Sequence, residues 1–274
     1  MGVPDSGLFG PASVTWRVHG DPLLPVGGLR ALLLQALHPR AMAAVAQHSG
    51  FRGDPWGRLQ RTAEYVGQLS FGDTVQAERA AARVRGVHRK LRATDPDTGL
   101  EYRVDDPDLL LWVHCCEVDS FLSTVRRGGL GLTDDQADRY LAEQVLAAAM
   151  VGLPADVVPA DRVALAAYFE RVRPELRLTS EARDAARFLL RPPMPTWVRW
   201  LTPARPAWGG LAGLGFALLP RWARRVYRLP GLPTTDAGAS AAVRALRTPL
   251  LVLPASVREG PHQKAARARL AQSA

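Results

Sequence analysis

Apolar positions in this chain recur mainly at helical spacing, and the pattern predicts an all-α protein. We find neither sustained apolar–polar alternation nor an Asn-Gly or Asp-Gly hairpin turn, so strands are not expected. The first apolar stretch covers residues 27–48 and contains Pro39. Because proline lacks a backbone donor and clashes with the preceding turn, we expect a kink or break near His38.

Capping residues predict where the later helices begin and end. The predicted helices run from Asp54 to about Ser70, from Asp73 to about Arg92, from Asp106 to about Arg126, from Thr133 to Gly152, and over 161–173 and 180–190. Thr133 and Gln136 form a capping box, whereas Pro55 and Pro107 occupy first helical positions.

A further apolar segment, residues 207–219, is too short to span a bilayer. One interpretation is a buried helix. The other is a surface that contacts a membrane or lines the entry of an apolar substrate. A peripheral membrane contact is therefore kept among the possible partners.

Length and composition suggest a single helical domain with extensions. Of the 274 residues, 47% are hydrophobic, which is enough for a large core. We divide the chain into an N-terminal extension (1–15), a helical domain (16–232) and a basic, loosely ordered tail (233–274). The first residues lack the pattern of a secretory signal, and the adjacent Cys115 and Cys116 cannot easily bridge. We therefore expect a cytoplasmic location.

The net charge of +9 raises the question of nucleic acid. Almost all the basic residues are arginine, a bias that also arises from genome composition. Much of the excess lies in residues 240–274, where six basic residues face one acidic residue. Nucleic acid is not expected as a partner, although a basic protein that binds nucleic acid or a membrane surface remains an alternative.

His88 is the first candidate for a cofactor ligand. Ala77, Ala81, Val84 and Leu91 share its helix face, which is apolar and so predicted to point inward. The small residues before His88 would leave room for a flat ligand. A lone histidine on such a face is more often a core residue with satisfied nitrogens, and that alternative stays open.

Two other histidines have related surroundings. His114 lies on an apolar stripe of the next helix, which favours a cofactor between the two helices. His38 precedes Pro39 at the expected break. A structural role is favoured for His38, although it stays among the candidate cofactor-binding residues.

Arg58, Arg61 and Thr62 lie close together on one predicted helix, on a face continued by Tyr65. A buried arginine there needs an anionic partner. That partner could be Glu64 or Asp73 of the protein, or a carboxylate or propionate of a ligand. By contrast, residues 114–117 (HCCE) resemble a metal cluster only superficially, because neighbours on a helix point in different directions.

Several motifs in order resemble the family of bacterial latex-clearing proteins (rubber oxygenases) and MpaB-type oxygenases. They are GGLRALLLQALHP, RLQRT, VRGVH, DPDLLLWVH and LLP-x(5)-VYRLP, and they extend from about Trp16 to Pro230. The resemblance implies an all-α, globin-like fold that binds haem b.

The resemblance also implies roles for particular residues. His88 would be the proximal iron ligand, and His114 a second histidine near the haem. Arg58 and Thr62 match the family's R-x-x-K/R-T motif. Arg61 stands where latex-clearing enzymes have lysine, and an arginine cannot ligate iron as a lysine amine can. Arg58 or Arg61 could pair with haem propionates or with bound oxygen.

The function that follows is a haem-dependent oxygenase, which uses dioxygen to oxidise a small hydrophobic substrate with an isoprenoid-like or other double bond. Polyisoprene is not expected, because an insoluble polymer requires secretion. The alternatives are a non-catalytic haem carrier or sensor, and the basic surface-binding protein described above.

Overall fold

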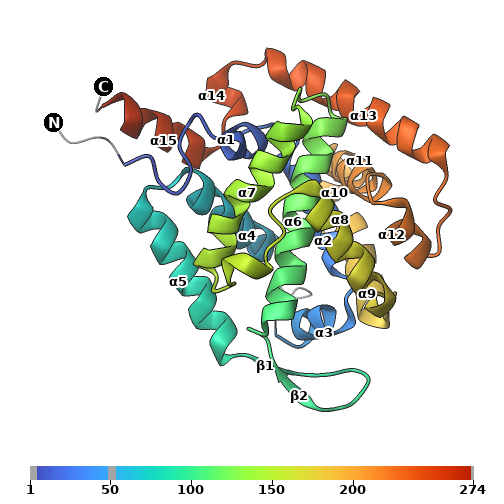
Figure 1. Ribbon diagram of the computed structural model, residues 1–274. Helices are drawn as coiled ribbons and strands as arrows, with labels where there is room; N and C mark the ends of the chain where they lie inside the picture. Colours follow the sequence, from blue (N-terminus) through green and yellow to red (C-terminus); the bar gives the residue numbers. More distant parts are fainter. Residues whose placement is uncertain (1–4, 49–53, 273–274) are drawn as a thin grey trace.

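Helices dominate the computed structural model, which describes residues 5–48 and 54–272 (Figure 1). The first half contains α1 (Val14–His19), α2 (Leu24–Gln35), α3 (Pro39–His48), α4 (Pro55–Phe71), α5 (Thr74–Lys90), β1 (Arg92–Thr94), β2 (Glu101–Arg103) and α6 (Pro107–Arg127). The second half contains α7 (Asp134–Met150), α8 (Arg162–Val172), α9 (Ser180–Leu190), α10 (Thr196–Leu201), α11 (Ala204–Ala217), α12 (Arg221–Val226), α13 (Pro233–Val252), α14 (Ala255–Arg258) and α15 (Pro261–Ala271). A mostly helical protein is thereby confirmed.

The helix starts follow the capping residues. The Asp73 carboxylate accepts a hydrogen bond from the Gln76 amide at 2.7 Å, and Thr133 accepts one from the Gln136 amide at 3.2 Å. Both sites are complete capping boxes. The predicted break near His38 is also confirmed, since α2 ends at Gln35 and α3 begins at Pro39.

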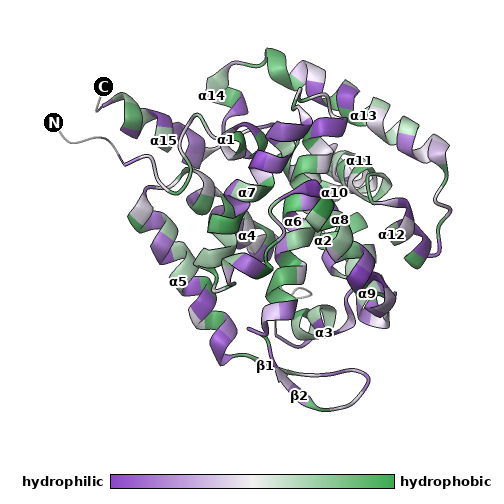
Figure 2. Ribbon diagram, viewed as in Figure 1, coloured by the Kyte–Doolittle hydropathy of each residue, from purple (hydrophilic) through white to green (hydrophobic). Residues whose placement is uncertain are grey.

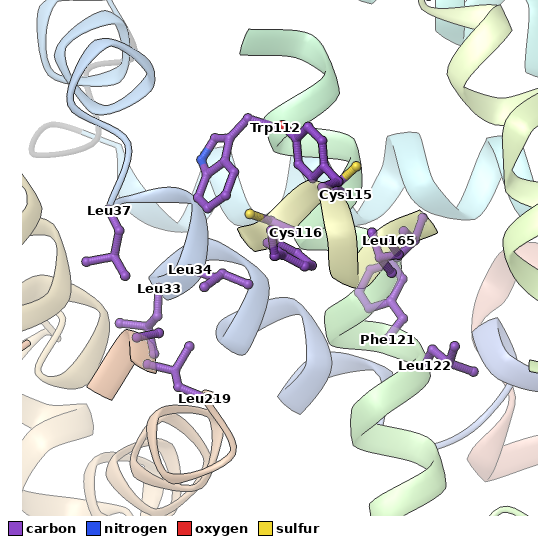
Figure 3. Close-up of a cluster of buried hydrophobic side chains, with 14 of the residues drawn as sticks. Leu33, Leu34, Leu37, Trp112, Cys115, Cys116, Phe121, Leu122, Leu165 and Leu219 are labelled. Atoms are coloured by element: carbon purple, nitrogen blue, oxygen red, sulfur yellow. The ribbon is translucent and has the colours of Figure 1, made fainter. Parts of the chain in front are cut away.

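The core is built around the pairing of α2 with α6. Figure 3 shows leucines of α2 facing Trp112, Cys115, Cys116 and Phe121 of α6. A Cβ at Gly27 would lie 3.1 Å from the Phe121 ring, so glycine allows the two helices to approach closely. This packing fixes which side of α6 is buried against α2 and which side is left for other contacts.

A small hairpin was not expected from the sequence. Strands β1 and β2 pair antiparallel, with Arg92 opposite Arg103. Their turn is closed by Asp95, whose carboxylate accepts from the Asp97 amide at 2.8 Å, and by Gly99 with a φ of +70°. Strands of three residues are too short to produce a visible alternation.

The segment 233–274, expected to be loosely ordered, forms α13 to α15 in its described part and packs on the remaining helices (Figure 1). Val243 and Ala266 are fully buried. An ion pair joins Arg247 to the buried Asp21 at 2.7 Å, and His262 meets Glu64 of α4 at 2.9 Å. Figure 2 shows hydrophobic and hydrophilic residues mixed along these helices.

The apolar segment 207–219 lies mostly in α11, which packs on α2. A Cβ at Gly215 would lie 3.2 to 3.3 Å from atoms of Leu29, Arg30 and Val26, so this face of α11 is in close contact. Only Ala212 and Gly215 of the helix are buried, which limits the buried-helix interpretation to one face. Within the described residues, no helix is both long and apolar enough to cross a bilayer.

Candidate functional site

His88 lies near the end of α5 and is half-buried. Burial lowers its pKa, and the nearby Asp105 carboxylate opposes the shift only in part. The ring is therefore neutral at neutral pH. Within the described part of the chain it makes no hydrogen bond, so a nitrogen lone pair is available to a ligand.

The small residues that precede His88 do not provide the space expected of them. Ala77 and Ala81 are buried in a cluster with Phe9, Trp16 and Phe71. They bring α5 against its neighbours instead of leaving room for a flat group. Any ligand of His88 must lie nearer the end of α5, where Val84 is half-buried.

His114 and Glu117 occupy one face of α6, three positions apart. Burial lowers the pKa of His114 to about 4 and raises that of Glu117 to about 7. Both side chains nevertheless keep some solvent access, and neither makes a hydrogen bond with a described residue. This combination is expected of polar groups that face a recess among helices.

Tyr65 of α4 connects Glu117 with a residue of α5, because charges of both act on its hydroxyl. The Tyr65 hydroxyl of α4 has a raised pKa, chiefly from burial and further from the Glu117 charge, while Arg85 of α5 opposes both. Arg85 also donates to the carbonyl of Met150 at the end of α7. Four helices therefore contribute to one polar, poorly solvated region.

The titration of Glu117 makes this region testable. Its pKa of about 7 lies above the ordinary 4.5, so ionisation between these values destabilises the folded state and stability falls as pH rises through that window. We expect Glu117→Gln to remove the loss, making the variant more stable than the parent at pH 8 by up to about 3 kcal/mol.

Urea unfolding of the ligand-free protein at pH 4, 6 and 8 would measure the effect. His114 changes stability in the opposite direction over a similar range, because its folded pKa is lowered. Because His114 is present in both proteins, the difference in unfolding free energy between the variant and the parent reports on Glu117 alone. A difference that does not change with pH would contradict the raised pKa of Glu117. Glu143→Gln is the matched control, since Glu143 already accepts hydrogen bonds from Thr15.

The three residues of the R-x-x-R-T motif on α4 have different surroundings. Arg58 is half-buried, with a pKa lowered by burial and by the neighbouring Arg61. Arg61 is exposed and pairs with Asp54 at 3.1 Å. Thr62 is exposed and donates to the Arg58 carbonyl at 3.0 Å. Of the three side chains, only that of Arg58 is half-buried.

The two carboxylates considered as arginine partners are engaged elsewhere. Glu64 meets His262 of α15 at 2.9 Å and accepts from Gln68 at 2.6 Å. Asp73 caps α5. The structure therefore leaves Arg61 with Asp54 and assigns neither Glu64 nor Asp73 to the arginines.

His38 is buried between α2 and α3, where its ring packs against Trp112 with centroids 5.9 Å apart. Its Nδ1 accepts from the Ala41 amide at 3.4 Å. These contacts give the ring a structural partner at the helix break. Its proposed contact with a cofactor stays a prediction.

Two polar features were not anticipated from the sequence. His19, which the sequence did not single out, is buried between Ser70 at 2.6 Å and Tyr140 at 3.0 Å. Glu117 had been considered only as part of HCCE. Its position three residues after His114 was the available signal, because that spacing places both on one helix face.

The side chains available as ligands limit which metal or cofactor this region could bind. Among the described residues, no three side chains of histidine, cysteine, aspartate or glutamate converge as a metal site. Cys115 and Cys116 are buried in the core, which raises the pKa of both thiols. A metal bound by one neutral imidazole must bring its other ligands with it, as iron in a porphyrin does. The neutral His88 ring could supply one ligand to such a group.

Comparison with known proteins gives one match. A family model described as "ER-bound oxygenase mpaB/B'/Rubber oxygenase, catalytic domain" matches residues 16–248. It extends past residue 232 and includes most of α13. No curated protein and no solved structure is significantly similar to the chain.

Proposed function

The chain belongs to the family of MpaB-type and rubber oxygenases, and from this premise we propose that it is a haem-b-dependent oxygenase of small hydrophobic molecules. The match over residues 16–248 is the observation that carries the proposal, because it covers every candidate site residue. The helices would then form a globin-like haem fold.

His88 is the proposed iron ligand. Its neutral ring can donate one nitrogen, and the other nitrogen needs an acceptor to fix the tautomer. The Asp105 carboxylate is a charged group that acts on the ring. Arg58 is the proposed partner of a haem propionate, because it is the half-buried cation of the R-x-x-R-T motif.

Bound haem would supply the iron at which dioxygen is activated. The chain's own residues would control protons and water around it. Glu117, with a pKa of about 7, can hold or release a proton at its carboxyl group near neutral pH. His114 stays neutral and can accept a hydrogen bond. Leu110, one turn before His114, is half-buried and adds an apolar wall.

Following the family resemblance, we propose oxidation of an isoprenoid-like or other alkene by dioxygen. A haem carrier or sensor would share the cofactor but would not consume oxygen.

Two measurements test the proposal in sequence. The purified chain, expressed with added haem precursor, should show a Soret band and a pyridine haemochrome spectrum of haem b. Oxygen uptake should then rise when short isoprenoid alkenes are added, and not with the corresponding alkanes. Colourless protein would exclude haem binding, whereas haem without substrate-dependent uptake would favour the sensor.

A further inference from the structure

An arginine-rich cleft lies away from the candidate site and is lined by residues of α6, α8, α12 and α13. Its volume is about 920 Å³. On α6 it is lined by Asp119, Ser123 and Arg126, roughly half a turn around the helix from His114 and Glu117 at 100° per residue. One helix thus separates two distinct regions.

The lining has a marked excess of positive charge. Seven arginines face the cleft, against the carboxylates of Asp119, Glu170 and Asp236. Asp236 is itself shared, since it pairs with Arg221 and with the buried Arg224. Arg126 and Arg162 pair with Asp134 and Asp138 outside the lining, so the charge left without compensation is smaller than the number of arginines suggests.

Arg127 and Arg244 carry this excess. Arg127 donates only to neutral acceptors, the Ser240 hydroxyl at 3.0 Å and the carbonyls of Leu218 and Asp236. Burial lowers its pKa, the Asp236 charge opposes this shift, and the nearby Arg30 and Arg224 act in the same direction as burial. Arg244 donates to the Arg127 carbonyl at 3.1 Å. Neither forms an ion pair with a carboxylate among the described residues.

The other wall of the cleft is aromatic. Phe169 and Trp222 have ring centroids 6.0 Å apart, and the Arg173 guanidinium lies 5.0 Å from the Trp222 centroid. Arg173 pairs with Glu170 through Nη2 at 2.7 Å, but its Nε is buried and has no hydrogen-bond partner in the described structure. Leu165 and Leu218 extend the apolar lining. A buried donor without a partner normally signals a missing acceptor.

We propose that this cleft binds an amphiphilic anion, with a carboxylate or phosphate head near Arg244, Arg127 and Arg173 and an apolar body against Phe169 and Trp222. The charge excess provides attraction for the head, and the aromatic wall provides burial for the body. This site is independent of the proposed haem site and does not require oxygenase activity.

Calorimetric titration with decyl phosphate below its micelle concentration tests the proposal. The parent protein should bind, and Arg173→Gln/Arg244→Gln should weaken binding at least about tenfold, because two charge-assisted donors are lost. Arg225→Gln, an exposed arginine on α12 outside the lining, should change affinity less than about twofold. Inorganic phosphate should bind more weakly than decyl phosphate, since it lacks the apolar body that would pack against Phe169 and Trp222.

A second variant keeps the test decisive if the double variant folds poorly. Ala237 is exposed and lines the cleft, so Ala237→Glu adds a negative charge without disturbing the core, and it should abolish binding. Decanoate tests the carboxylate form of the head. Failure of both anions to bind, binding unchanged in either variant, or binding only to phosphatidylglycerol vesicles that the variants do not affect would overturn the proposal.

Discussion

His88→Ala is expected to yield folded protein with less than about a tenth of the parental haem content, because the proposed iron ligand is lost. The half-buried position of His88 and its lack of a hydrogen bond within the described structure mean that its removal sacrifices little packing. Pyridine haemochrome assay per mole of purified protein is the measurement. Added imidazole should restore part of the Soret band, since a free ring can replace the missing side chain.

Two matched variants make this result specific. His114→Ala should retain haem and change activity, and the exposed His48→Ala should change neither. Equal haem loading of the His88 and His114 variants would contradict the ligand assignment. Loss of haem from His114→Ala alone would transfer the ligand role from α5 to α6.

Asp21→Ala is expected to destabilise the protein by about 3 to 5 kcal/mol, because it leaves the Arg247 charge without its carboxylate. The Asp21 side chain is 2% exposed and that of Arg247 is 12% exposed, so solvent cannot replace the lost contact. Asp21 also accepts from the Leu23 amide at 3.0 Å. Urea unfolding measures the change, and limited proteolysis would show whether α13 detaches first.

A surface ion pair supplies the control. Asp97 pairs with Arg177, and both side chains are about half exposed. Asp97→Ala should therefore cost less than about 1 kcal/mol. In Asp21→Ala/Arg247→Ala the unpaired charge is also removed, so the double variant should be more stable than Asp21→Ala alone. A double variant as unstable as the sum of both single changes would show that the two groups do not interact.

Most of the helical framework could be predicted from the sequence because its signals are local. The capping boxes at Asp73 and Thr133 join atoms only three residues apart. Pro39 ends one helix and begins another through its own ring. The residues that point inward from α5 and α6 also follow from helical periodicity, and this is how His88 and His114 were singled out.

The surroundings of His88 and His114 could not be predicted from the sequence, because they are set by the tertiary structure. Ala77 and Ala81 looked like space beside His88, yet neighbouring side chains fill it. The tail looked loosely ordered because its helices have narrow apolar faces, and the contact that docks it joins Asp21 to Arg247, 226 residues apart. The arginine-rich cleft likewise combines α6, α8, α12 and α13.

The physical reason is the range of each interaction. Caps, prolines and helix faces are set within a few residues, so sequence alone determined the helices, the inward histidines and the family resemblance. Burial, pKa shifts and charge balance arise between elements that are distant in sequence. Only the tertiary structure could therefore show that Glu117 titrates near neutral pH, that His19 is a core residue, and that the excess arginine charge gathers on the far side of α6.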